Sequence, residues 1–318
     1  MRLATPAPVV FLTFNRPETT SLVFERIRAA KPNKLFLVSD GPRAIREGEA
    51  DKVESVRNII RQVDWDCDVK EIFSATNMGC RERVRTGITE ALNEVDQVII
   101  LEDDCLPDST WFSFATEMLT YFKAESNILS VRGDNYQRGR RFGKGCYYFS
   151  KYPTCWGWAV WRRSWELIDT DLSDWPQQVD SGMLSRSCES EEEIEYWRNI
   201  FEDTYKKFVD SWAYAWVYAS FKYSGIHVTP NVNLIRNIGF DADATHTKNG
   251  RPRWAPYSLG QIDSINHPGD RIVSATADHR EFLWMHLNRE PDLARRLLKL
   301  EPIRSLLRGF RRKHMRLR

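Results

Sequence analysis

Three consecutive carboxylates, Glu102-Asp103-Asp104, follow directly after an apolar run at residues 98–101. Four aliphatic residues in a row are typical of a buried strand inside a parallel sheet. Carboxylates this close together repel one another unless a cation or a polar ligand offsets their charge. Their oxygens suit Mg²⁺ or Mn²⁺, above all a metal that also binds substrate phosphates. The triplet therefore indicates a metal-diphosphate site, and the alternative is an acidic loop or the negative first turn of a helix.

The elements that must position this triplet alternate between strand and helix over the first hundred residues. In chain order the predicted elements are strand 9–14, helix 17–30, strand 35–38, helix 48–63, strand 69–73, helix 80–93 and strand 98–101. This alternation favours a parallel, doubly wound sheet, in which ligands bind beyond the carboxyl ends of the strands. The polar residues at those ends are candidates for one site: Asn15, Asp40, Asn77 and Glu102.

After residue 104 the alternation loosens. The predicted elements there are helix 110–123, strand 128–131, a glycine- and arginine-rich loop 133–145, helices 189–209 and 212–223, and strands 226–228 and 232–235. Between them, residues 152–165 hold four tryptophans around Gly157. The chain contains neither an internal repeat nor a low-complexity linker. We therefore predict one α/β domain over residues 1–290, with insertions in its second half.

The charge of the chain is unevenly distributed, although its net value is only +2. Residues 295–318 hold ten Lys or Arg against one acid, a charge of +9, which leaves −7 for residues 1–294. Apolar residues at helical spacing make this tail, residues 291–318, a predicted basic amphipathic helix. Such a helix either lies on an anionic membrane surface or docks on the body of the protein. Nucleic acid is the least favoured partner.

Composition excludes several other classes. No apolar run approaches the roughly 20 residues that a membrane-spanning helix needs, and the first residues lack the pattern of a secretory signal peptide. The six cysteines include no Cys-x-x-Cys pair, which argues against a zinc site and against a disulfide scaffold. We expect a cytoplasmic protein, peripheral at the inner membrane face if the tail binds lipid.

A series of short motifs, in this order, resembles the nucleotide-diphospho-sugar transferases of the GT-A fold. The likeness is to bacterial family 2-like members and, more distantly, to the N-acetylglucosaminyltransferase that initiates complex N-glycans. It covers about residues 7–290. The motifs are Phe-Asn-Arg-Pro (14–17), Ser-Asp-Gly (39–41), Asn-Met-Gly-Cys (77–80), Glu-Asp-Asp (102–104), Cys-Trp-Gly-Trp (155–158), Asp-Ser-Trp-Ala-Tyr-Ala-Trp (210–216) and Asn-Ile-Gly-Phe-Asp-Ala-Asp-Ala-Thr-His-Thr (237–247).

The resemblance implies a GT-A fold, with a mostly parallel sheet, and an inverting, metal-dependent transferase. By this resemblance, Asp104 is expected to bind Mn²⁺ or Mg²⁺ between the sugar-nucleotide phosphates. His246 is expected to add a second metal or diphosphate contact. Glu102 and Asp103 reach the ribose and the sugar. The remaining residues that the resemblance assigns to the nucleotide-sugar are Asn15, Arg16, Asp40, Asn77, Gly79 and Cys80.

The resemblance also implies the ligands. The donor is a nucleotide-diphospho-sugar, with a UDP-sugar favoured, and the acceptor is a glycan or a lipid-linked molecule. Aromatic faces suit the C–H faces of sugars, and glycine permits close approach of the backbone. The residues assigned to the sugar and acceptor are Trp156, Gly157, Trp158 and Trp212. The alternative for the tryptophans is the hydrophobic core, where such large side chains are usually buried.

One position departs from the resemblance. An inverting transferase needs a carboxylate that takes the proton of the acceptor hydroxyl, and in similar enzymes it follows the first Trp of the segment that begins at Trp212. Here that residue is Ala213. An introduced substitution, the use of Asp210 instead, or a natural pseudoenzyme would each explain the alanine. The alternative role for Asp210 is the N-cap of a helix.

Two rival functions remain open at this point. A nucleotidylyltransferase would carry a glycine-rich, lysine-bearing phosphate loop after its first strand, and residues 15–18 offer none. A sugar-nucleotide-binding or glycan-binding module without a catalytic base would retain the triplet and tolerate Ala213. Slow metal-dependent hydrolysis of the donor distinguishes the transferase from the binding module.

Overall fold

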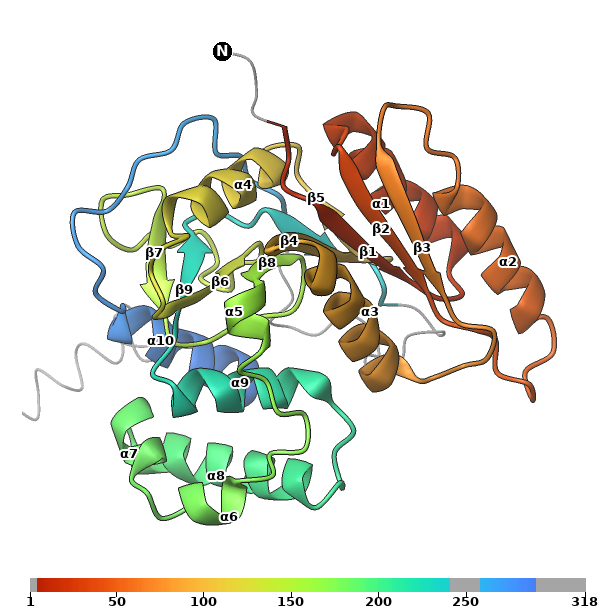
Figure 1. Cartoon of the computed structure of the whole chain (residues 1–318). Helices are drawn as coiled ribbons and strands as arrows, with labels where there is room; N and C mark the ends of the chain where they lie inside the picture. The colour runs from red at the N-terminus through yellow and green to blue at the C-terminus, as the bar shows by residue number, and fades with distance from the viewer. Residues whose placement is uncertain (1–4, 241–257, 290–318) are drawn as a thin grey trace, which may run out of the picture.

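The computed structural model describes residues 5–240 and 258–289 of the chain. Its centre is a mixed, mostly parallel sheet of eight strands, in the order β3-β2-β1-β4-β8-β6-β9-β7, flanked by helices (Figure 1). Four of the seven strand pairings are parallel and three are antiparallel. The prediction of an α/β protein with a mostly parallel central sheet flanked by helices is confirmed.

The parallel half of the sheet comes from the first third of the chain. Its strands are β1 (Val9–Thr13), β2 (Lys34–Ser39), β3 (Asp68–Phe73) and β4 (Gln97–Glu102), and the helices between them are α1 (Pro17–Ala30), α2 (Glu49–Ile60) and α3 (Cys80–Glu94). Each lies close to its predicted range. The register pairs Val9 with both Leu35 and Ile99, so the carboxyl ends of β1, β2 and β4 meet at one edge of the sheet.

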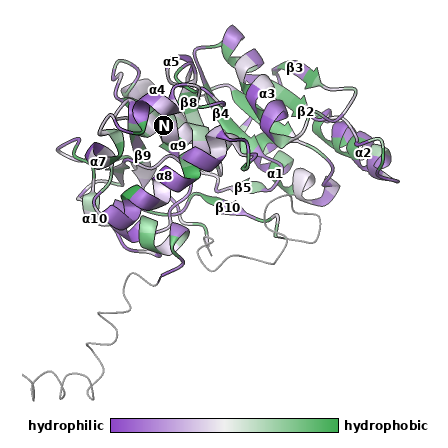
Figure 2. Cartoon of the chain, turned by 90° about the horizontal axis from the view of Figure 1, so that it is seen from below, coloured by the Kyte–Doolittle hydropathy of each residue, from purple (hydrophilic) through white to green (hydrophobic). Residues whose placement is uncertain are grey.

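Alternate residues of these strands pack into two apolar cores, one on each face of the sheet. On one face, Val9 and Phe11 pack with side chains of α1, α2 and α4 (Trp111–Tyr121). On the other face, Val10 and Leu12 pack with α3, α5 (Arg162–Trp165) and α9 (Trp212–Lys222). Burial on both faces explains why these strands are continuous apolar runs, and Figure 2 shows that hydrophobic residues predominate along β2 and β4. The sheet is thereby held rigidly at the edge where its strands end.

The antiparallel half of the sheet was only partly predicted. Its strands are β6 (Ile128–Arg132), β7 (Tyr147–Ser150), β8 (Trp158–Trp161) and β9 (Ile226–Pro230). Strand β8 lies between β4 and β6 and runs antiparallel to both. Strand β8 was not predicted, because a four-residue strand buried on both faces has no polar–apolar alternation. Since β4 and β6 both oppose β8, their carboxyl ends lie at the same edge.

A two-stranded sheet extends this edge. It pairs β5 (Cys105–Pro107) with β10 (Ile235–Asn237) in antiparallel register, Asn237 opposite Cys105. The strand predicted at 232–235 therefore begins only at Ile235. The pairing brings the segment after β10 onto the acidic triplet, because the Ile238 amide donates to the Asp104 carbonyl at 2.8 Å.

A helical lobe is inserted between β8 and β9, below the sheet in Figure 1. Besides α5 and α9 it contains α6 (Trp175–Gln178), α7 (Met183–Ser187) and α8 (Glu191–Tyr205). Helix α8 begins where Ser190 accepts a hydrogen bond from the Glu193 amide at 3.2 Å, the usual role of an N-cap serine. An aromatic core that includes Trp197 and Phe201 joins α6, α7 and α8 to α9 within the lobe. The lobe is thus packed against the sheet through α9.

The described chain ends in α10 (Ala275–Glu281) and a π-helical turn, Phe282–His286, which pack beside β7. Neither was predicted from the sequence. Among residues 5–240 and 258–289, no helix has both the length and the apolar character that a bilayer crossing requires. The basic tail predicted at residues 291–318 lies outside the described residues.

Candidate functional site

The acidic triplet lies at the carboxyl end of β4, in the turn that leads into β5. Its backbone and side chains are held from two sides: Asp103 accepts a hydrogen bond from the Phe14 amide at 3.1 Å, and the segment after β10 binds the carbonyl of Asp104. A Cβ added to Gly239 would stand 2.2 Å from the Asp104 carboxylate, so only glycine permits this approach. The triplet is therefore a fixed feature of the fold.

One guanidinium lies against the triplet. Arg16, in the turn before α1, places its Nη1 atom 2.7 Å from Oδ2 of Asp104 and 3.6 Å from Oδ1 of Asp103. Asn237 adds a long hydrogen bond of 3.4 Å to the other oxygen of Asp104. Among residues 5–240 and 258–289, Arg16 is the one cation that forms an ion pair with the triplet, so these residues bring three carboxylates and one positive charge together.

Glu102 differs from Asp103 and Asp104 in its contacts. Its carboxylate is half-buried, and no described residue hydrogen-bonds to it or forms an ion pair with it. Burial, together with the charges of Asp104 and Asp103, raises the pKa of Glu102 to about 8, although the charge of Arg16 opposes this rise. A buried carboxylate that lacks a partner is costly unless a ligand or cation completes its surroundings. Glu102 is the residue that an added cation would stabilise most.

The donor set fits a hard divalent cation. All candidate ligands in the triplet are carboxylate oxygens, the donors that Mg²⁺ and Mn²⁺ prefer. Within the described part of the chain, no group of three or more His, Cys, Asp or Glu side chains is arranged around a common metal position. Mg²⁺ usually keeps several waters and takes only one or two protein carboxylates together with substrate phosphates, so Asp104 and Glu102 suffice. His246 lies outside the described residues.

Asp40, after β2, fastens the loop that precedes α3. One of its oxygens accepts hydrogen bonds from the amides of Gly41 and Met78, at 2.8 and 2.9 Å. The other accepts from the Asn77 side chain at 2.9 Å and the Gly79 amide at 3.1 Å. Burial raises the pKa of Asp40, and these backbone donors lower it. Four donors fill the carboxylate, so its role here is to position the loop.

The amide nitrogen of Asn77 is used in hydrogen bonds within the protein, which leaves its amide oxygen to accept one from a ligand. The nitrogen donates to Asp40 and, at 3.0 Å, to the Gly41 carbonyl, and these bonds fix the orientation of the side-chain amide. No described residue donates to the oxygen. Gly79, which has φ of +82°, ends the loop at the first turn of α3. The structure therefore brings Asp40, Asn77 and Gly79 together, as the strand-end argument predicts.

The side chain of Asn15 contacts the start of α2. Its side chain donates to Glu49 at 2.9 Å, at the start of α2. Glu49 is buried, and its ion pair with Arg43 lowers the pKa of Glu49 to about 2. In this structure Asn15 thus belongs to a polar cluster that fastens the turn after β1 to α2, beside the triplet rather than on it.

Two cysteines border the triplet. Although Cys80 is exposed as a residue, the protein around its thiol raises the pKa of Cys80 to about 12, and Glu102, Asp210 and Asp104 add to the shift. Burial also raises the pKa of Cys155, again with Glu102 contributing. Both thiols stay protonated at neutral pH.

The tryptophans divide into core and site. Trp158 is fully buried, and its ring stacks on that of Trp212 with centroids 5.8 Å apart. The prediction that these two contact ligand is therefore corrected: their rings belong to the core under α9. Trp156 is only half-buried and packs edge-on against Phe240. Gly157 has φ of +61°, and a Cβ there would stand 2.5 Å from Ile235, so its glycine serves close packing.

The position where the resemblance places a catalytic base, Ala213, is half-buried. Ala213 lies in the first turn of α9 and carries no polar group. Asp210 precedes that helix but does not cap it, because the N-cap is Ser211, and no side-chain capping bond forms. The side chain of Asp210 is 82% exposed, and its Oδ1 lies 3.9 Å from Nη1 of Arg81. The N-cap alternative for Asp210 is therefore wrong, and its carboxylate is accessible.

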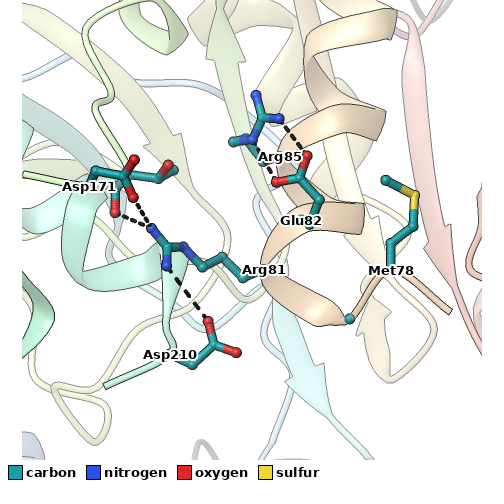
Figure 3. Close-up of a pocket in the computed structure, with 8 residues that line it drawn as sticks. Met78, Arg81, Glu82, Arg85, Asp171 and Asp210 are labelled. Carbon is teal, nitrogen blue, oxygen red and sulfur yellow. Dashed lines mark hydrogen bonds and ion pairs between the residues drawn. The ribbon is translucent and has the colours of Figure 1, made fainter. Parts of the chain in front are cut away.

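A polar cavity of about 490 Å³ opens between the start of α3 and the helical lobe (Figure 3). Its lining residues are Met78, Gly79, Arg81, Glu82, Arg85, Thr170, Asp171 and Asp210. Arg81 crosses the junction and donates to the Thr170 carbonyl at 2.5 Å and to Asp171 at 2.8 Å. Sequence reasoning missed this cavity because its two walls lie about 90 residues apart and meet only through folding.

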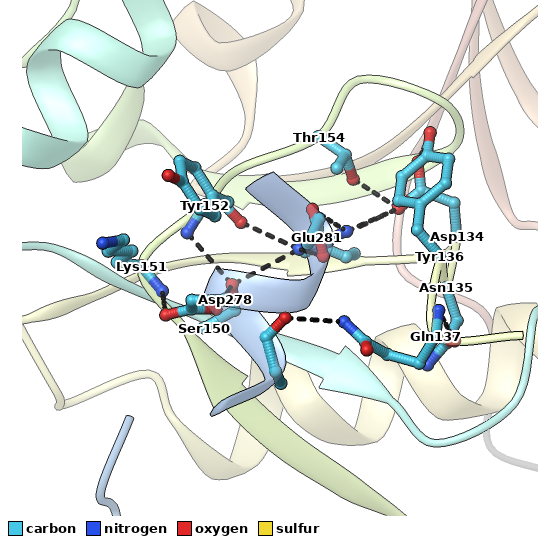
Figure 4. Close-up of polar contacts among 12 residues, drawn as sticks. Asp134, Asn135, Tyr136, Gln137, Ser150, Lys151, Tyr152, Thr154, Asp278 and Glu281 are labelled. Carbon is cyan, nitrogen blue, oxygen red and sulfur yellow. Dashed lines mark hydrogen bonds and ion pairs between the residues drawn. The ribbon is translucent and has the colours of Figure 1, made fainter. Parts of the chain in front are cut away.

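A buried polar network lies at the carboxyl end of β6 (Figure 4). Arg132, with no exposed surface, donates to Glu281 at 2.9 Å and to Asp134 at 3.4 Å. Asp134 also accepts from Thr154 at 2.5 Å, two residues before Trp156. Burial raises the pKa of Glu281 to about 7, and the charge of Arg132 opposes that shift. The network thus ties helix α10 to the tryptophan segment.

No family model and no curated protein sequence matches this chain. Similar solved structures include the mannosyltransferase PcManGT from Pyrobaculum calidifontis in complex with GDP-Man and Mn²⁺, at 11% identity over 69% of this chain and 70% of that one, with a TM-score of 0.37. Another is apo UDP-glucose pyrophosphorylase, at 11% identity over 70% and 90%, with a TM-score of 0.31. A third is 4-diphosphocytidyl-2C-methyl-D-erythritol synthase from Anaerococcus prevotii, at 8% identity over 69% and 98%, with a TM-score of 0.25. Likenesses this distant identify no family, so function must be inferred from the residues of the chain itself.

Proposed function

We propose that this chain is a metal-dependent, inverting glycosyltransferase of the GT-A type. It moves a sugar from a nucleotide-diphospho-sugar to a hydroxyl of a glycan or lipid-linked acceptor. One observation carries the proposal: Glu102, Asp103 and Asp104 lie together where a sheet binds its ligands, and within the described part of the chain Arg16 is the one cation paired with them. This concentration of carboxylate oxygens suits a divalent cation that binds a diphosphate.

The metal would be held by Asp104 and Glu102. When bound, Mn²⁺ or Mg²⁺ supplies positive charge to the diphosphate as it leaves the sugar. We assign a contact with a diphosphate oxygen to Arg16, whose guanidinium lies 2.7 Å from Asp104. Asp103 stays bound to the Phe14 amide and holds the turn. The proposed role of His246 as a further metal contact rests on the sequence resemblance alone.

The nucleotide would bind at the loop that Asp40 fastens. Because Asp40 is filled by four donors of the chain itself, we assign the base contact to the amide oxygen of Asn77. An acceptor at this point favours a base that presents a ring N–H, as uracil does, and it agrees with the preference for a UDP-sugar. Gly79 and Cys80 would line the ribose side.

Asp210 is the proposed general base. It takes the proton of the acceptor hydroxyl as that oxygen forms its bond to the anomeric carbon. The bond between the anomeric carbon and the diphosphate breaks, and the diphosphate leaves with the electron pair. Ala213 cannot accept the proton, whereas Asp210 is exposed and not engaged as a helix cap.

A sugar-nucleotide-binding pseudoenzyme is the second candidate, and the observation that favours it is Ala213. The two candidates share the donor site and differ in turnover. Release of UDP from UDP-glucose, UDP-galactose or UDP-N-acetylglucosamine in the presence of Mn²⁺ supports the transferase. Tight donor binding without any release supports the pseudoenzyme.

Calorimetric titration with UDP tests the donor site in both candidates. The intact chain should bind UDP with Mn²⁺ present and lose most of that affinity when the metal is chelated. Asp104→Asn should abolish the effect of Mn²⁺, while the exposed surface variant Asp66→Asn should behave as the unsubstituted protein. Equal binding of UDP by Asp104→Asn and the unsubstituted chain would refute the metal site.

A further inference from the structure

The cavity between α3 and the helical lobe lies at the same edge of the sheet as the acidic triplet. Gly79 lines the cavity and donates its amide hydrogen to Asp40 at the end of β2, and β2, β1 and β4 end together at that edge. Asp210 lines the same cavity, with its Oδ1 3.9 Å from Nη1 of Arg81. A molecule in the cavity would thus approach the donor sugar from the side of Asp210.

Each arginine that lines the cavity is paired with a carboxylate. Arg81 pairs with Asp171, and Arg85 binds both oxygens of Glu82, at 2.5 and 3.0 Å. The two arginines face three carboxylates when Asp210 is included, a formal charge of −1. The cavity therefore has no surplus of positive charge with which to bind a phosphate.

The cavity also lacks the surface that a lipid chain needs. Met78 is the one apolar side chain among its described lining residues. The others offer guanidinium donors beside carboxylate acceptors, as Figure 3 shows for Arg81 between Asp171 and Asp210. A ligand that both donates and accepts hydrogen bonds at several points matches this lining, and its volume is within the range of small-molecule sites.

We propose that this cavity is an acceptor subsite that takes a neutral, hydroxyl-rich sugar. Arg81 and Asp171 act as binding residues for its hydroxyl groups, and Asp210 faces the hydroxyl that reacts. This inference rests on the proposed transferase function and narrows it, because the group bound beside the donor is the sugar end of the acceptor. A lipid-phosphate end is disfavoured by the carboxylates and by the polar lining.

Saturation-transfer NMR on the full chain, with UDP and Mn²⁺ present, tests the inference. The probes are the methyl glycosides of glucose, galactose, mannose and N-acetylglucosamine, with glucose 6-phosphate and octyl phosphate as charged comparators. We expect at least one methyl glycoside to bind and both phosphates to bind more weakly. Failure of every methyl glycoside, or tighter binding of either phosphate, would overturn it.

Two variants link the binding to the cavity. Arg81→Ala should weaken the bound methyl glycoside about tenfold, because a charge-assisted hydrogen bond is lost. The matched control Arg61→Ala, which removes an exposed guanidinium paired with Glu71, should leave it unchanged. Asp171→Asn should shift the preference towards glucose 6-phosphate several-fold, since it removes a negative charge beside Arg81, and a purely structural role predicts no such shift.

Measuring UDP binding alongside probe binding distinguishes failure of the acceptor subsite from failure of the proposed function. If UDP binds with Mn²⁺ but Arg81→Ala and Asp171→Asn bind the probes as the unsubstituted chain does, the acceptor subsite is wrong and the proposed function stands. If UDP itself does not bind, the proposed function fails first. Thermal unfolding of each variant separates a local loss of binding from a loss of fold.

Discussion

The donor and acceptor halves of the candidate site are built in different ways. The donor half rests on the ends of adjacent parallel strands, where Asp40 is filled by four hydrogen bonds and Asp103 is fastened to the turn after β1. The acceptor half lies where an inserted lobe meets α3, and exposed ion pairs such as that of Arg81 with Asp171 hold it. The first is preorganised by the sheet, whereas the second depends on how the lobe is seated.

This difference has a consequence for function. Preorganised polar groups lower the cost of binding a ligand, so the donor half should bind its nucleotide without rearrangement. Exposed ion pairs contribute little to stability, and the walls of the acceptor cavity are therefore free to adjust. The predictions below change residues of either half or of the buried network around Arg132, and they run from the largest expected effect to the smallest.

The largest effect is expected at the proposed base. Asp210→Asn should lower transfer, or donor hydrolysis, by about 10²–10⁴-fold, because the proton of the attacking hydroxyl loses its acceptor. Affinity for UDP should not change, and release of UDP measured against time gives the rate. Ala213→Asp in the Asp210→Asn background should restore part of the loss. Full activity of Asp210→Asn would show that the base lies elsewhere.

The next largest effect is expected in the buried polar network at the carboxyl end of β6, where Arg132→Met should destabilise the fold. The substitution leaves Glu281 and Asp134 buried without their guanidinium, which costs about 3–5 kcal/mol in the free energy of unfolding. Urea denaturation followed by tryptophan fluorescence measures it. Arg61→Met, at an exposed pair, should cost less than about 1 kcal/mol. Equal stability of the two variants would contradict a structural role for the network.

The pH dependence of stability tests Asp278, which lies in the same network. Burial raises its pKa to about 6 from an ordinary value of 3.8. The folded protein therefore binds a proton that the unfolded chain releases, so the contribution of Asp278 to stability falls as pH rises from about 4 to about 6. Relative to Asp278→Asn, the unsubstituted chain should lose up to about 3 kcal/mol over this window, at about 1.4 kcal/mol per pKa unit.

Urea titrations at several pH values measure that difference. Asp66→Asn, the same substitution at an exposed side chain, serves as the control. A constant difference between the unsubstituted chain and Asp278→Asn would show that the pKa of Asp278 is not raised.

The smallest effect is expected in the donor half. Asn77→Ala removes one proposed contact to the base and should weaken UDP about three- to tenfold, the worth of a neutral hydrogen bond. The dependence on Mn²⁺ should stay intact, since the triplet is untouched. Calorimetry of UDP with Asn77→Ala measures the change, and an unaltered affinity would remove Asn77 from the nucleotide site.

The donor half was largely predictable because its signals are local. Apolar runs that end in Asp40, Asn77 or Glu102 identify strands and their carboxyl ends, and parallel strands bring those ends together. The residues that complete it were harder to find. Gly239 and Asn237 reach Asp104 through the pairing of β5 with β10, which no local pattern encodes.

The acceptor half was poorly predictable because long-range packing creates it. Trp158 and Trp212 looked suited to a sugar, yet they stack in the core because β8 inserts beneath α9. Arg81 and Asp171 carry no pattern that relates them, although their contact shapes the cavity. Arg132 likewise finds Glu281 from a distant segment. Such pairings follow from tertiary structure alone.

Anomalous diffraction at the manganese edge tests the account most directly. Crystals grown with UDP and Mn²⁺ should show one strong peak within about 2.0–2.3 Å of an Asp104 carboxylate oxygen, with the diphosphate on its other side. Glu102 should lie against the same ion or its waters. A UDP molecule bound elsewhere, or a bound diphosphate without manganese at the triplet, would contradict the proposed donor site.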